Sequence, residues 1–124
     1  MEFFKKFNQE AQENLERQLN MVVSSLIGVR VRTTVSIKED TRYDIPKKSI
    51  AITSENIADD MSPRMFKELK IENFGGNLAG SANQYVLSIH YRYTHFSSGS
   101  NGSDLAKVII NPDGSIVSFN SELV

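Results

Sequence analysis

The strongest constraint on the fold is a change in the spacing of apolar residues at Gly28. Before it, apolar residues recur every three or four positions, which places them on one stripe of an α-helix. They are Phe3, Phe4, Phe7, Ala11, Leu15, Leu19, Val22, Val23 and Leu26. After it, apolar and polar residues alternate, the pattern of a strand with one buried face. The sequence therefore predicts one long helix over residues 3–26, followed by β-structure.

Five strands are predicted after the helix, from alternation and from turn residues. They cover residues 29–38, 48–53, 84–96, 105–111 and 115–119. The last three form a meander, with a loop at residues 97–103 and a tight turn at Pro112-Asp113-Gly114. Between the second and third strands, Ser62-Pro63 predicts the start of a short helix over 63–70. The glycine-rich residues 73–82 are expected to form a loop.

These elements predict a single α+β domain over residues 1–124. The long N-terminal helix would pack on a twisted antiparallel sheet of four to five strands, because each element must bury its apolar side against another. In outline, the order of elements resembles the cystatin-like and NTF2-like cone architectures. The resemblance lies in element order alone and no motif accompanies it, so it implies an outline of the fold and no family function.

Composition narrows the classes of function. The chain has 124 residues and no cysteine, which excludes disulfides, thiolate metal sites and cysteine nucleophiles. No signal segment or membrane span is apparent, so we expect a cytoplasmic protein that does not bind membranes. The net charge is −1, yet residues 27–50 carry six Lys or Arg and only three acids. The region of the first strand is therefore locally basic.

No group of residues predicts catalysis or a cofactor. His90 and His95 are an odd number apart on one strand, so they would lie on opposite faces of the sheet. His90 shares its face with Ser88 and Arg92, but a solvated sheet face commonly has this composition, and an exposed or hydrogen-bonded His90 is the preferred interpretation. The acids at Asp59-Asp60 match no calcium loop, and the glycines after position 74 match no phosphate loop. We predict no catalytic residue, no metal and no cofactor.

The cations favour an interaction surface. Arg30, Arg32, Lys38 and Arg92 would form one basic face if their strands were neighbours. Nucleic-acid binding would require more interleaved aromatic residues and a larger positive excess, so an acidic protein partner fits better. The leading hypothesis is a small non-catalytic protein-interaction module of accessory, immunity or inhibitor type. Its predicted partner-binding residues are Arg30, Arg32, Arg92 and His90.

The alternative hypothesis is a small-ligand-binding or enzymatic NTF2-like cone. Tyr91, Tyr93 and His95 would then line an internal pocket, since apolar walls with a few polar groups are typical of ligand sites. Tyrosines also fill ordinary core positions of strands, which is the simpler interpretation. Under either hypothesis a homodimer is compatible with the long apolar stripe and with open sheet edges.

Overall fold

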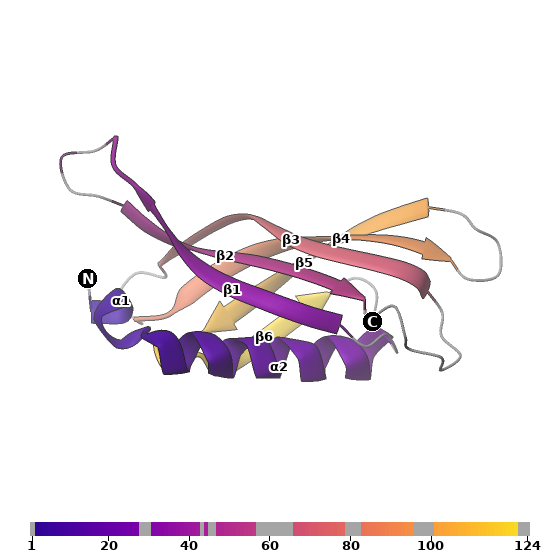
Figure 1. Cartoon of the computed structure of the whole chain (residues 1–124), viewed down its shortest axis with the longest axis horizontal. Helices are drawn as coiled ribbons and strands as arrows, with labels where there is room; N and C mark the ends of the chain where they lie inside the picture. Colours follow the sequence, from indigo (N-terminus) through magenta and orange to yellow (C-terminus); the bar gives the residue numbers. More distant parts are fainter. Residues whose placement is uncertain are drawn as a thin grey trace.

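A computed structural model describes residues 2–27, 31–42, 44, 47–56, 66–78, 83–95 and 101–121 (Figure 1). For residues 2, 24–27, 47, 55–56, 66–78, 91–95, 101–104 and 121 it describes the backbone alone. The two helices are α1 (Glu2–Lys6) and α2 (Gln9–Ile27). The strands are β1 (Val31–Asp40), β2 (Lys47–Asn56), β3 (Phe66–Leu78), β4 (Tyr85–His95), β5 (Asn101–Ile110) and β6 (Ile116–Ser121).

The fold is α+β, as predicted, with α2 packed on antiparallel strands (Figure 1). The strands follow one another in sequence order from β1 to β6. The β2–β3 pairing covers only three registered positions, Thr53 to Glu55. The hairpin β1–β2 is therefore separated over most of its length from the meander β4–β6. No closed cone forms among the described residues, since β1 and β6 are the two edges.

The predicted N-terminal helix is interrupted at Phe7 and Asn8. The side-chain oxygen Oδ1 of Asn8 accepts a hydrogen bond from the backbone N–H of Ala11 at 3.0 Å. Asn8 is thus the N-cap of α2, because asparagine satisfies a backbone donor that has no partner within the helix. The apolar stripe was predicted correctly from Phe3 to Val23, where its side chains are described, but this local cap divides it between two helices.

The predicted helix over 63–70 and the predicted loop over 73–82 are wrong where the structure describes them. Residues Phe66–Leu78 form β3, which pairs with β4 at eleven positions. The register shifts between Phe66 and Glu68 and between Asn73 and Gly75, so Gly75 and Gly76 lie in an irregular strand rather than in a loop. Pairing with β4 overrides the local turn preference, and the described residues form six strands instead of the four or five predicted.

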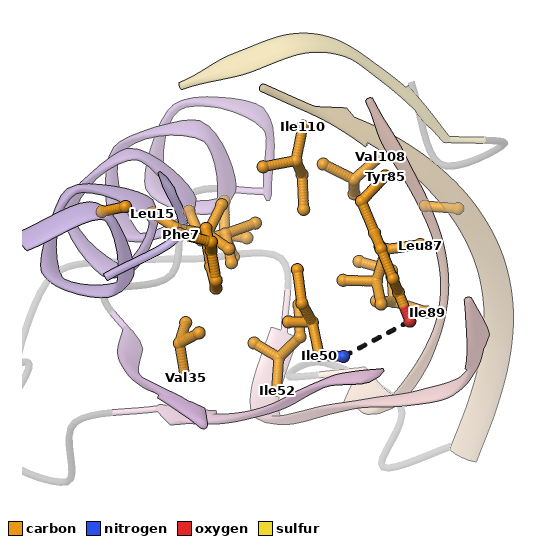
Figure 2. Close-up of a cluster of buried hydrophobic side chains, with 14 of the residues drawn as sticks. Phe7, Leu15, Val35, Ile50, Ile52, Tyr85, Leu87, Ile89, Val108 and Ile110 are labelled. Atoms are coloured by element: carbon orange, nitrogen blue, oxygen red, sulfur yellow. Dashed lines mark hydrogen bonds between the residues drawn. The ribbon is translucent and has the colours of Figure 1, made fainter. Parts of the chain in front are cut away.

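The core lies between α2 and the concave face of the strands (Figure 2). Phe7, Leu15 and Leu19 of the helical stripe are buried, as are Val35, Ile50, Ile52, Leu87, Ile89, Val108 and Ile110 from four strands. Burying each large aliphatic side chain contributes about 1.5–3 kcal/mol. The inner face of the described strands therefore packs against the helix, and the outer face is the side of the sheet that the helix leaves open.

Candidate interaction surface

The outer face of the sheet is the side of the strands that α2 does not cover. On β1, Arg32, Thr34 and Lys38 are exposed, whereas the alternating residues Val31 and Val35 are buried. On β5, Lys107 is exposed and Leu105 retains 52% of its surface, while Ala106 and Val108 are buried. On β4, Val86, Ser88 and His90 are half-buried. The period-2 pattern of the sequence produces this division, because successive side chains point to opposite faces.

The strand register places several charged residues in one row across the sheet. Arg32 is paired with Glu55, Glu55 with Lys70, and Lys70 with Arg92. Neighbouring strands lie about 4.8 Å apart, so the Cα atoms of Arg32 and Arg92 are roughly 14 Å apart along this row. We call these four residues the charged row. The fold thus places two arginines that are 60 positions apart in sequence on nearby strands.

A second row follows two residues along the strands. It contains Thr34, Thr53, Glu72, His90 and Leu105 as successive register partners. Thr34, Thr53 and Leu105 are exposed, and His90 is half-buried. Lys107 lies two residues beyond Leu105 on β5 and is paired with Ser88. The exposed side chain of Leu105 therefore lies between His90 on the neighbouring strand β4 and Lys107 on the same strand β5.

Charge on this surface differs from that of the whole chain. The net charge of the protein is −1, whereas the charged row contains three cations and one acid, and the second row adds the acid Glu72. Arg32, Lys38 and Lys107 are the charged side chains described at the outward positions 32–38, 86–90 and 105–109. At the end of β1, Arg42 donates from Nη2 to Asp40 Oδ2 at 2.7 Å. This hydrogen bond raises the pKa of Arg42 and balances the charge of Asp40 locally.

The predicted partner-binding residues have different positions in this surface. Arg32 is exposed on it, and His90 lies half-buried in the second row. The backbone of Arg92 belongs to the charged row, while its side chain and the whole of Arg30 lie outside the described residues. Lys70 is an addition that the sequence interpretation missed, because its segment was expected to be helical. The alternation of Leu69 and Ile71 with Lys70 and Glu72 was a period-2 signal that could have identified it.

The predicted pocket residues Tyr91, Tyr93 and His95 belong to β4, and the structure describes only their backbone. Tyr91 is the register partner of Ile71, which is itself paired with Ser54. Ser54 is buried and shares a hydrogen bond of 2.8 Å with the Thr33 hydroxyl, which also donates to Asn20 Oδ1 at 2.6 Å. This row therefore contains a buried polar network that links β2 and β1 to α2.

Tyr85 is the tyrosine whose surroundings are fully described. Its hydroxyl accepts a hydrogen bond from the backbone N–H of Ile50 at 3.3 Å, across the gap between β4 and β2 (Figure 2). Its ring lies 5.7 Å from Phe3 and 5.9 Å from Phe4. Burial raises the pKa of Tyr85, and the hydrogen bond from Ile50 partly opposes that shift. These contacts assign the phenol a structural role between the two parts of the sheet.

An open hollow of about 450 Å³ lies on the opposite side of the molecule, beside α1 and α2. Its lining is of mixed charge and comprises Lys6, Asn8, Glu10, Ala11, Asn14, Arg17 and Asp113. The amides of Asn8 and Asn14 already bond the Ala11 N–H and the Asp113 carbonyl oxygen. With cations and acids interspersed and its amides engaged in the fold, this hollow selects no particular ligand.

Within the described ranges, no three His, Asp or Glu side chains are grouped to hold a metal ion. Neither helix described here has the length and apolar character needed to span a membrane. The chain matches no protein-family model, no curated protein and no solved structure.

Proposed function

We propose that this protein is a non-catalytic interaction module of accessory, immunity or inhibitor type, which binds a macromolecular partner through the outer face of its sheet. The observation that supports this proposal is the charged row, in which Arg32 is exposed on the face that the helix leaves uncovered and the backbone register continues from it through Glu55 and Lys70 to Arg92. Charged residues on a surface accelerate association with a partner of complementary charge pattern and disfavour partners whose charges clash with it.

The test is affinity capture from an extract of the source cells, with variants matched in charge. Arg32→Glu combined with Arg92→Glu reverses two cations of the charged row. Lys6→Glu combined with Arg17→Glu makes the same change in net charge on the helix side of the molecule, where both residues are exposed. Circular dichroism and thermal unfolding would first confirm that both variants are folded.

We expect the wild type and the helix-side variant to capture the same stoichiometric partner, and the row variant to lose it. Loss in both variants would indicate a general effect of net charge rather than a specific surface. Retention of the partner by the row variant would contradict the proposed binding face.

A second candidate function is a small-ligand site of the cone type, lined by Tyr91, Tyr93 and His95. It is supported by the register, in which Tyr91 is paired through Ile71 with the buried Ser54 and so lies in a row of the inner face. The test is a thermal-shift screen of small molecules, followed by Tyr91→Phe and Tyr93→Phe variants. A ligand that stabilises the wild type and loses its effect in these variants would support this function in place of the first.

A further inference from the structure

We infer that Asp113 is a modification site, at which the chain converts to isoaspartate when the β5–β6 turn opens, and that the folded turn suppresses this reaction. The inference is independent of the proposed binding face. Its basis is the dipeptide Asp113-Gly114, the one place in the sequence where glycine follows an aspartate. Glycine has no side chain to hinder the attack of its own amide nitrogen on the preceding carboxyl group. Asp113 is also exposed, so water reaches that group.

The reaction needs no partner other than water. The amide nitrogen of Gly114 attacks Cγ of the protonated Asp113 carboxyl group and loses its proton, and the carboxyl hydroxyl leaves with that proton as water. The product is a cyclic imide, in which Cγ and the main-chain carbonyl carbon of Asp113 are both bonded to the Gly114 nitrogen. Water then opens the ring at either carbonyl. Opening at the main-chain carbonyl gives isoaspartate, in which the chain runs through Cβ and Cγ, and the mass of the protein is unchanged.

The folded turn engages both reacting groups in other bonds. The Gly114 N–H donates to the carbonyl oxygen of Asn111 at 2.9 Å, so the proton that must leave is held within the turn. The Asp113 Oδ1 atom accepts hydrogen bonds from the Ser115 hydroxyl at 2.6 Å and from the Ser115 N–H at 2.9 Å. These bonds lower the pKa of Asp113, and the ionised carboxylate is a poor electrophile. The nitrogen and the carboxyl group are therefore both unreactive while the turn is intact.

Helix α2 holds the turn closed from outside. Asn14 Nδ2 donates to the main-chain carbonyl oxygen of Asp113 at 3.0 Å, and Gly114 lies directly against the backbone of Ala11. Isoaspartate turns that carbonyl into a free carboxylate and lengthens the main chain between residues 113 and 114 by one carbon atom. The modified turn therefore no longer fits against the helix, and the modification weakens the contact between α2 and the β5–β6 hairpin.

Peptide mapping of the full-length protein measures the reaction. Residues 108–124 contain no Lys or Arg, so trypsin releases them as one peptide, in which Asp113 is the one aspartate. Its aspartate and isoaspartate forms have equal mass and separate by chromatography, and a protease that cleaves before aspartate cuts only the first. The protein would be incubated at neutral pH in buffer and in guanidinium chloride. Asp113→Glu is the chemical control, because glutamate keeps the charge but closes a larger ring more slowly.

We expect isoaspartate to form at least roughly tenfold more slowly in buffer than in denaturant, which corresponds to about 1.4 kcal/mol or more for opening the turn. Asn14→Ala should raise the rate in buffer and leave the rate in denaturant unchanged, because it removes a contact that exists only in the fold. Glu16→Ala is the matched control, since its bond goes to Val35 in β1 and not to the turn. It should leave the rate in buffer at the wild-type value.

Equal rates in buffer and in denaturant would overturn the protection by the turn. Denatured wild-type protein that formed isoaspartate no faster than the Asp113→Glu variant modifies its glutamate would overturn the site itself. Equal acceleration by Asn14→Ala and Glu16→Ala would assign the reaction to global unfolding and contradict local opening. The purified isoaspartate form, refolded, should have a lower melting temperature than the unmodified protein, and an unchanged melting temperature would contradict the loss of the helix contact.

Discussion

At the scale of single residues, Gly114 shows how one position fixes the contact between a turn and a helix. Its φ is +87°, and its N–H donates to the carbonyl oxygen of Asn111 at 2.9 Å within the β5–β6 turn. A Cβ atom at this position would overlap the backbone carbonyl of Ala11 in α2. The turn therefore requires glycine both for its conformation and for its close approach to the helix.

We predict that Gly114→Ala destabilises the protein by on the order of 2 kcal/mol or more, because the left-handed conformation and the overlap with Ala11 both raise the energy of the folded state. Urea denaturation would measure the change. Asn83→Gly is the control, since Asn83 has φ of 51° and glycine adopts that conformation without strain. A Gly114→Ala variant as stable as the wild type would show that the helix and the turn can separate at little cost.

Because the phenol of Tyr85 is buried, we predict that the stability of the fold declines at alkaline pH. Burial raises the pKa of the folded phenol above the value near 10 of an unfolded chain. The unfolded state therefore loses its proton first, and the contribution of Tyr85 to stability is complete below about pH 10 and declines as pH rises towards the folded pKa. Urea denaturation between neutral and alkaline pH should show this decline. It should be smaller in Tyr85→Phe, which cannot ionise, and an identical decline in both proteins would assign it to other groups.

At the scale of elements, α2 bonds both edges of the sheet. The Oε1 atom of Glu16 accepts a hydrogen bond from the Val35 N–H of β1 at 2.8 Å. The Oε1 atom of Gln18 accepts one from the Ile116 N–H of β6 at 2.7 Å. Because these strands are the two edges, the helix occupies backbone donors that another chain could otherwise bind. The polar residues beside the apolar stripe thus have a structural role that helical periodicity alone does not show.

We predict that Glu16→Ala destabilises the protein by about 1–3 kcal/mol, because a charge-assisted hydrogen bond is lost at the Val35 N–H. Glu16→Gln should lose less, since its amide oxygen can still accept that bond. Amide hydrogen exchange would test the assignment directly, with faster exchange at Val35 in the alanine variant. The mechanism would be rejected if both variants lost equal stability and left exchange at Val35 unchanged.

A helix or strand could be predicted from the sequence when residues close to it along the chain stabilise it. The helical stripe, the first two strands, the meander and the turn at Pro112 to Gly114 follow from spacing and turn chemistry that neighbouring residues carry. β3 does not, because its glycines and register shifts weaken the local signal and pairing with distant strands, mainly β4, stabilises it. The same cause hid Lys70 and therefore part of the candidate surface.

At the scale of the whole molecule, the rings of Phe3, Phe4 and Phe7 form an aromatic cluster with Tyr85, whose hydroxyl bonds β2. The ring of Phe3 stacks on Phe7 at 5.3 Å and lies 5.7 Å from Tyr85. Both phenylalanines are fully buried. Since β2 and β3 pair over so few positions, this cluster and the Tyr85 hydroxyl join the hairpin β1–β2 to the meander.

We predict that Phe7→Ala destabilises the protein by about 3–5 kcal/mol, because it removes a buried ring and leaves a cavity at this junction. Met21→Ala is the control. It should change stability by less than about 0.5 kcal/mol, because Met21 lies in α2 with 68% of its surface exposed. Thermal and urea unfolding would measure both changes. Similar effects of the two substitutions would contradict a specific role for the aromatic cluster.

The sequence alone determined the class of the fold, the apolar stripe, most strands, the final turn and the exposure of Arg32. These depend on periodicity and on residue preferences that act within a few positions. Only the tertiary structure decided the six-strand order and the placement of Arg32, Lys70 and Arg92 in one row. The physical reason is that register is set by pairing between distant strands and by burial of one common face, and neither is encoded within a single segment.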